Sequence, residues 1–297
     1  MAPGAAAHPV GQPAAEGLDL APGQSVELLK ALHILTRDGR LNQDSRRKLK
    51  QVNHLLQFIE PLLADALQRR GDVSLVDHGA GKSYLGFMLY DRFFSGRTQG
   101  LVYGIESRAE LVTRSVELAK ALGFARMRFL PLRVQEAIGS TELPAQVDVV
   151  TALHACDTAT DDAIAFALAK RARHVVLVPC CQAEVAGVLR QNKALSLSRT
   201  PLAELWRHPL HTREFGSQIT NVLRCLRLEA CGYQVTVTEL VGWEHSMKNE
   251  LILATHTGSP GKASARERLA AILAELNLHE LTARFSVDGP APAADRP

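Results

Sequence analysis

Three short segments contain residue types that can hold a ligand or take part in catalysis. The first is a turn with two glycines, Asp77-His78-Gly79-Ala80-Gly81-Lys82-Ser83, which follows a short apolar run and precedes an apolar segment of helix length. The others are Glu106, twenty-nine residues after Asp77, and the stretch His154-Ala155-Cys156-Asp157. In an open α/β sheet, ligands bind beyond the carboxyl ends of the strands, where glycine lets the backbone come close. These segments predict a ligand site at one sheet edge.

The spacing and charge of the glycine turn distinguish between ligand classes. A phosphate-binding P-loop needs a glycine five residues before Gly81, where Val76 stands, and Asp77 would repel phosphates. A dinucleotide fingerprint needs a third glycine where Tyr84 stands. A carboxylate there instead attracts the amino group of a bound amino-acid moiety. We therefore expect S-adenosylmethionine as cofactor, held by Asp77, Gly79, Ala80, Gly81 and Lys82.

Glu106 ends the second apolar run, and a carboxylate at such a strand tip can accept hydrogen bonds from both ribose hydroxyls. The alternative is a surface glutamate ahead of the helix expected from Arg108, where the helix dipole favours an acid. We expect Glu106 to bind the ribose, Gln135 to meet the adenine and Leu153 to line the same site.

Short apolar runs alternate with helix-length segments from residue 72 onward, which predicts a parallel sheet with right-handed crossovers. The predicted parallel strands are 73–77, 101–106, 127–132, 147–153 and 174–179. Two further runs, 233–241 and 250–257, are joined by too short a link for a parallel crossover. The predicted fold class is therefore α/β, a Rossmann-like class I methyltransferase sheet of seven strands whose last pair is an antiparallel hairpin.

Apolar residues that recur every three or four positions predict an amphipathic helix ahead of the sheet, bent or split at Pro61. Both ends of the chain are rich in Ala, Pro and Gly, a composition typical of disorder. The predicted organisation is a disordered tail over 1–24, an N-terminal helical extension over 25–70, an S-adenosylmethionine-dependent methyltransferase domain over 71–258, a C-terminal helical segment over 259–287 and a disordered tail over 288–297.

Composition sets limits on the class of protein. The 297 residues, 46% hydrophobic and 22% charged, suffice for a buried core. A net charge of +3 excludes a uniformly basic surface, so any nucleic-acid contact must be local. Five cysteines without a CxxC pair fit neither a disulfide scaffold nor a zinc ribbon. No apolar run approaches the roughly 18 residues of a membrane span. We expect a cytoplasmic protein that does not enter the membrane.

Four segments together resemble the methyltransferase domain 32 family of class I methyltransferases: Asp77–Leu85, Thr151–Asp157, Val178–Gln182 and Glu244–Asn249. The resemblance spans about Leu49 to Thr257 and includes that family's Asp-x-Gly-x-Gly-Lys loop, Leu-His-x-Cys-Gly/Asp motif and Cys-Cys pair. The chain is similar to a eukaryotic tRNA 2′-O-methyltransferase domain and to several methyltransferase-like proteins. The resemblance implies an S-adenosylmethionine-dependent enzyme. Gln182 departs from the aromatic residue or His that follows the Cys pair in many relatives.

The segment after the fourth strand is the position from which class I methyltransferases reach the methyl group and its acceptor. We expect His154 and Asp157 there, with Lys248, to be catalytic; a lysine can pair with a phosphate or lower a nucleophile's pKa. The alternatives are that Asp157 caps the next helix, that His154 is a partly buried structural histidine and that Lys248 is a solvated turn residue.

We expect Cys180 and Cys181, at the end of the fifth strand, to bind the acceptor together with His245 and Asn249 of the hairpin link. With His154 and Cys156, the pair offers ligand types that zinc accepts. Successive strand side chains point in opposite directions, however, so no metal is expected. Packing of small apolar thiols is the other interpretation.

Four basic residues could follow an RNA backbone: Arg46, Arg47, Lys48 and Lys50. The outer face of an amphipathic helix explains the same residues. The sequence thus predicts an S-adenosylmethionine-dependent methyltransferase of undetermined acceptor, with RNA (tRNA or rRNA) favoured. The alternatives are a P-loop-like nucleotide hydrolase and a methyltransferase-fold binding module without turnover.

Overall fold

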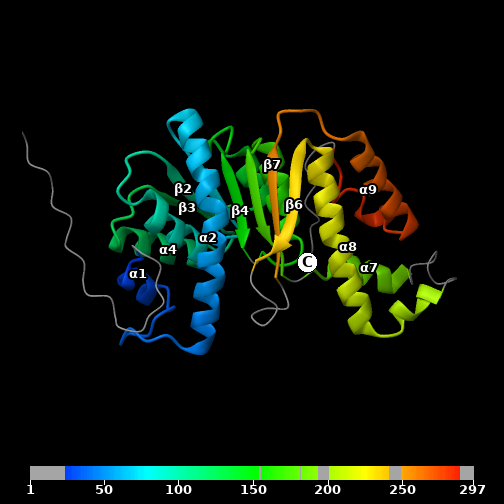
Figure 1. Cartoon of the computed structure of the whole chain (residues 1–297), viewed down its shortest axis with the longest axis horizontal. Coiled ribbons are helices and arrows are strands. Elements are labelled where there is room, and N and C mark those ends of the chain that lie inside the picture. The colour runs from blue at the N-terminus through cyan, green and yellow to red at the C-terminus, as the bar shows by residue number, and fades with distance from the viewer. Residues whose placement is uncertain (1–23, 154, 181, 193–200, 241–248, 288–297) are drawn as a thin grey trace, which may run out of the picture.

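The computed structural model describes residues 24–153, 155–180, 182–192, 201–240 and 249–287. Within these ranges seven strands form one sheet in the order β3-β2-β1-β4-β5-β7-β6 (Figure 1). The strands are β1 Ser74–His78, β2 Leu101–Ile105, β3 Met127–Leu130, β4 Val149–Leu153, β5 His174–Val178, β6 Tyr233–Glu239 and β7 Glu250–His256.

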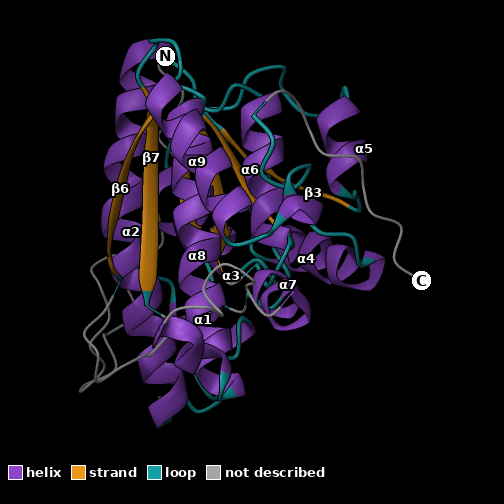
Figure 2. Cartoon of the chain, turned by 90° about the vertical axis from the view of Figure 1, so that its right-hand side faces the viewer, coloured by secondary structure: helices purple, strands orange, loops and turns teal. Residues whose placement is uncertain are grey.

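The strand pairing confirms the predicted topology. β1 to β5 pair in parallel, whereas β7 runs antiparallel to both β5 and β6. Figure 2 shows the pair β6 and β7 along one side of the sheet. Because β1 to β5 are parallel, their carboxyl ends lie at one edge, and the start of β7 lies at the same edge, since Ile252 pairs with Leu177 near the end of β5. This order is that of a Rossmann-like class I methyltransferase sheet.

Helices connect the strands and cover both faces of the sheet (Figure 1). The α-helices are α1 Val26–Ala31, α2 Gln43–Arg70, α3 Tyr84–Leu89, α4 Ala109–Ala121, α5 Val134–Gly139, α6 Ala159–Ala169, α7 Glu184–Asn192, α8 Pro209–Ala230 and α9 Ala263–Glu275. A π-helical turn, η1 Tyr90–Phe94, continues α3, and the described residues also include the 3-10 turns η3 Pro201–Trp206 and η4 His279–Leu281. None of the described helices is both long and apolar enough to cross a membrane.

Helix α2 is continuous from Gln43 to Arg70, so of the bend or split predicted at Pro61 the split does not occur. The Asn42 side chain accepts a hydrogen bond from the Ser45 amide at the start, and Gly71 takes the left-handed conformation at the end, with φ of 71°. Pro61 lacks an N–H and removes one helical hydrogen bond. Buried Ile59 and Leu63 on either side hold the helix against the sheet. Burial of each such side chain stabilises the fold by about 1.5–3 kcal/mol, enough to offset that loss.

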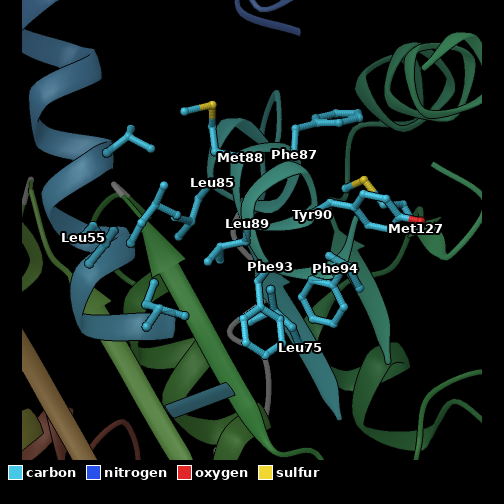
Figure 3. Close-up of a cluster of buried hydrophobic side chains, with 14 of the residues drawn as sticks. Leu55, Leu75, Leu85, Phe87, Met88, Leu89, Tyr90, Phe93, Phe94 and Met127 are labelled. Atoms are coloured by element: carbon cyan, nitrogen blue, oxygen red, sulfur yellow. The ribbon is translucent and has the colours of Figure 1, made fainter. Parts of the chain in front are cut away.

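A single hydrophobic cluster joins α1, α2, α3, η1 and one face of the sheet. Figure 3 shows Leu55 of α2 and Leu75 of β1 in this cluster with the side chains of α3 and η1. A second cluster lies between the other face and helices α5 and α6, and a third joins α7, α8 and α9. The apolar stripe of α2 is therefore part of the same core as the strand that leads into the glycine turn.

Candidate functional site

The glycine turn connects β1 to α3 at the carboxyl edge of the sheet. Gly79 and Gly81 have positive φ of 67° and 57°, which favours residues without a Cβ. The Ala80 amide donates to the Ile105 carbonyl oxygen at 3.0 Å, and this bond attaches the turn to the end of β2. The backbone of the turn is thus held in a fixed shape beside the second strand.

Asp77 is directed into the protein and not toward solvent, because its side chain is only 2% exposed. Its carboxylate accepts hydrogen bonds from the Thr151 hydroxyl at 2.9 Å and the Ser83 hydroxyl at 3.4 Å. Burial raises its pKa to about 6, against the lowering effect of these bonds and of one from the Gly86 amide. The carboxylate therefore holds the glycine turn through Ser83, and the contact with a ligand amine that the sequence predicts stays a prediction.

Glu106 lies directly after β2 and is 7% exposed. Its Oε2 accepts a hydrogen bond from the Gly81 amide at 2.9 Å, and Arg108 forms an ion pair with Oε1 at 3.0 Å. Burial raises the pKa of Glu106, but the bonds from Arg108 and Gly81 outweigh it and hold the pKa below its ordinary value. The carboxylate is therefore ionised at neutral pH and sits in direct contact with the glycine turn.

The other residues expected to hold the cofactor surround the same edge. Lys82 and Gln135 are exposed, the latter in the first turn of α5 after β3. Leu153 ends β4 and is half-buried against the α2-side cluster. The structure thus places Lys82 after β1, Gln135 after β3 and Leu153 at the end of β4, all at the carboxyl edge of the sheet.

Of the residues expected to be catalytic, only Asp157 is described; His154 and Lys248 lie outside the described residues, as do Cys181 and His245. Asp157 has φ of 48°, and its Oδ1 accepts hydrogen bonds from the amides of Ala183 and Glu184 at 3.0 and 3.1 Å. It therefore caps α7 and not the helix that follows it in sequence. A direct catalytic role for Asp157 would have to use Oδ2.

A buried polar network that the sequence did not predict lies behind the segments after β4 and β5. Arg224 of α8 is fully buried and donates to the Asp161 carboxylate at 2.6 Å and to the Asp157 carbonyl oxygen at 2.8 Å. Asn221 accepts from both Arg224 and Gln182 and donates to Glu250. The network links Asp157, Gln182 and the start of β7 through α8. Gln182, the departure from the family pattern, is one of its buried members.

The two described thiols at this edge are close to each other: the Sγ atoms of Cys156 and Cys180 lie 3.3 Å apart. Asn249, expected to bind the acceptor, is 9% exposed, and its carbonyl oxygen accepts from the Leu240 amide at 2.8 Å. Over the described part of the chain, no group of three or more His, Cys, Asp or Glu side chains could hold a metal ion.

His78 is a second polar residue that sequence reasoning did not single out. It is 6% exposed, its ring lies 5.5 Å from that of Phe166, and neither ring nitrogen has a hydrogen-bond partner among the described residues. Burial lowers its pKa to about 4, although the nearby charge of Glu106 raises it. The imidazole is therefore neutral at physiological pH.

The basic residues of α2 begin beside the glycine turn. Arg46, Arg47, Lys48 and Lys50 are all exposed on the first turns of the helix. The Lys48 ammonium lies 3.5 Å from the centre of the Tyr84 ring, and Tyr84 is the first residue of α3, directly after the turn. A positively charged surface therefore adjoins the site, where Lys82 and Arg108 are also exposed.

A known protein family matches the part of the chain that forms this site. Residues 47–188 match the family described as Methyltransferase domain. The matched region runs from the basic start of α2 to α7, and it contains the glycine turn, Glu106, Asp157 and both described thiols of the site.

Two curated relatives are the glutathione S-transferase C-terminal domain-containing proteins of Homo sapiens and Macaca fascicularis, each 25% identical over 235 residues. The alignment covers 73% of this chain but 34% of each relative, so the chain spans about a third of their length.

Similar solved structures include magnesium protoporphyrin IX methyltransferase from Synechocystis PCC 6803, with a TM-score of 0.41, 15% identity and coverage of 78% of this chain and 93% of that one. Another is an rRNA methylase from Streptococcus thermophilus, with a TM-score of 0.40, 10% identity and coverage of 67% and 94%. The strand order β3-β2-β1-β4-β5-β7-β6 itself identifies the Rossmann-like fold.

Proposed function

We propose that this chain, which over residues 47–188 is a member of the methyltransferase-domain family, transfers the methyl group of S-adenosylmethionine to RNA. The contact between Gly81 and Glu106 carries the cofactor part of this proposal. The basic start of α2 beside the glycine turn carries the acceptor part.

The residues at the carboxyl edge of the sheet fit S-adenosylmethionine. The turn leaves the Gly79 and Gly81 positions free of side chains, so the backbone can approach the methionine moiety. Glu106 is ionised beside that turn, where a carboxylate can accept hydrogen bonds from the two ribose hydroxyls. In contrast, Val76 is buried in β1 where a P-loop needs glycine, and the Asp77 carboxylate lies beneath the turn. The missing glycine and the nearby negative charge disfavour a nucleoside triphosphate as the ligand.

The bound cofactor would supply an activated methyl group, and the chain would position it. We propose that Gly79, Ala80 and Gly81 hold the methionine end, that Glu106 orients the ribose and that Gln135 contacts the adenine. Arg108 now pairs with Glu106, and its exposed guanidinium can move into solvent when hydroxyl groups take its place. Asp157 shapes the acceptor side by holding the start of α7, while His154 and Lys248 remain proposed catalytic groups.

The position of the basic residues at the start of α2 supports an anionic acceptor. Lys48 contacts the first residue of α3, so the basic turn of α2 is adjacent to the site and not on a remote surface. Lysine and arginine bind phosphates of RNA with little dependence on base identity. The arrangement would hold an RNA strand across the start of α2 with one nucleotide at the ends of β4 and β5.

Incubation with methyl-labelled S-adenosylmethionine and separate RNA, protein and small-metabolite fractions of a cell extract tests the proposal. We expect label in RNA. The double variant Arg46→Gln/Arg47→Gln should raise the RNA concentration needed for half-maximal labelling and leave cofactor affinity unchanged, because these side chains meet only the acceptor.

A matched control removes the same charge elsewhere. Arg266 and Arg268 are exposed on α9, which lies on the other side of the molecule from α2 (Figure 1). The variant Arg266→Gln/Arg268→Gln should label RNA like the parent. Label confined to protein or metabolites would contradict the RNA acceptor but leave the methyltransferase activity standing; no label in any fraction would contradict both.

A further inference from the structure

Cys156 and Cys180 come from segments that follow two neighbouring strands. Leu153 and Val178 are register partners at the ends of β4 and β5, and the two cysteines follow them by three and two residues. Their Sγ atoms lie 3.3 Å apart, and neither thiol is in a disulfide. A disulfide bond is about 2.05 Å long, so the sulfurs need to approach by only about 1.2 Å.

We propose that Cys156 and Cys180 form a reversible disulfide when the protein meets a hydroperoxide. Cys156 is exposed and Cys180 is half-buried beside it, so an oxidant can reach the first thiol while the second is already in place to react. The bond would join the segment that contains Asp157 to the segment that leads to Gln182. This proposal does not depend on methyl transfer.

Hydrogen peroxide can oxidise the two thiols to a disulfide in two steps. The Cys156 thiolate attacks one peroxide oxygen, the O–O bond breaks, and the released hydroxide takes a proton to leave as water; the cysteine becomes a sulfenic acid. The Cys180 thiolate then attacks that sulfur, the S–S bond forms, the S–O bond breaks, and a second water leaves. Two thiols are oxidised to one disulfide, and one peroxide is reduced to two waters.

The other described thiols are poor competitors. Cys225 is part of α8, and its burial raises the pKa of its thiol to about 12, so the reactive thiolate is scarce. Cys231 follows α8 near Tyr233 at the start of β6, which is the end of the sheet opposite the Cys156–Cys180 pair. Among the described thiols, only Cys156 and Cys180 are therefore placed to form a disulfide with each other.

Peptide mapping of the reduced full-length chain tests this. The protein is treated with increasing hydrogen peroxide, quenched with catalase, alkylated with N-ethylmaleimide and digested with trypsin without reduction. We expect one cross-link between the tryptic peptides 134–170 and 174–190, a fall from five free thiols to three, and return of all five with dithiothreitol.

Because Cys180 and Cys181 share the second peptide, near-isosteric variants assign the partner. The cross-link should disappear in Cys156→Ser and in Cys180→Ser and persist in Cys181→Ser. A cross-link that persists in Cys180→Ser would overturn the proposal. So would a parent that shows only unlinked thiols or sulfinic acids at these positions while circular dichroism shows it folded.

Discussion

Asp77 introduces a carboxylate into an apolar setting, and its partners there are hydroxyl groups and one backbone amide. Burial raises its pKa to about 6, from 3.8 in the unfolded chain. A group whose pKa is higher in the folded state stabilises the fold when it is protonated, so this contribution is present below about pH 4 and is lost as the pH rises through about 6.

The variant Asp77→Asn should therefore change how stability depends on pH. The amide keeps the shape and cannot ionise, so its free energy of unfolding relative to the parent should improve by on the order of 3 kcal/mol between pH 4 and pH 7. Urea denaturation of both proteins at four pH values measures this difference. A difference that is constant over this range would show that Asp77 keeps an ordinary pKa.

Helix α8 is tied to its neighbours by one side chain, because Arg224 links it to α6 and to the segment after β4. Arg224 and Asp161 are 1% and 4% exposed in their side chains, so each would leave a buried, unpaired charge without the other. The pair specifies how α8 sits against α6, and thereby where Asp157 and Gln182 lie.

Loss of the Arg224 guanidinium should strongly lower the free energy of unfolding. Arg224→Met should lower the free energy of unfolding by about 3–5 kcal/mol, since it leaves the Asp161 charge buried without its partner, and Arg224→Met/Asp161→Leu should recover much of that loss. The exposed pair Arg213–Glu214 gives the control: Arg213→Met should change stability by less than about 1 kcal/mol. Chemical denaturation of the four proteins provides the measurement. Equal losses of stability in the single and double variants would show that the unpaired Asp161 charge is not the cause.

The strands and helices that could be predicted are those marked by a local pattern of apolar residues. Alternating apolar runs predicted five parallel strands, and the short link before β7 predicted the hairpin, so the directions of the strands follow from the sequence. The continuity of α2 across Pro61 does not, because packing on distant strands decides it. The capping of α7 by Asp157 and the Arg224–Asp161 pair join residues 26 and 63 positions apart, and no periodicity signals such pairs.

The net charge of the chain is only +3, but its basic side chains are unevenly distributed over the surface. The basic start of α2 lies against the glycine turn, whereas many other cations are paired with acids within the chain, as Arg284 is with Glu184 and Arg173 with Asp65. RNA affinity should therefore depend on a few side chains and fall with salt.

Salt titration should separate these side chains from the rest. For a single-stranded RNA oligonucleotide, the slope of log affinity against log salt should become shallower by roughly 1.4 in Arg46→Gln/Arg47→Gln, because each single-strand phosphate that an arginine neutralises adds about 0.7 to that slope. Arg266→Gln/Arg268→Gln should keep the parental slope. Fluorescence anisotropy at five salt concentrations measures it, and identical slopes in all three proteins would place RNA, if it binds, on another surface.

Isothermal titration of the full-length chain with S-adenosylmethionine measures cofactor recognition by the glycine turn and Glu106. The parent should bind one cofactor per chain, and Glu106→Gln should weaken binding about 10- to 150-fold, since a hydrogen bond to a charged group is worth about 1.5–3 kcal/mol. Glu117→Gln, an exposed change on α4, should bind like the parent. A parent that does not bind S-adenosylmethionine at millimolar concentration but binds ATP with magnesium would contradict the cofactor assignment. A Glu106→Gln variant with parental affinity would contradict the role of Glu106.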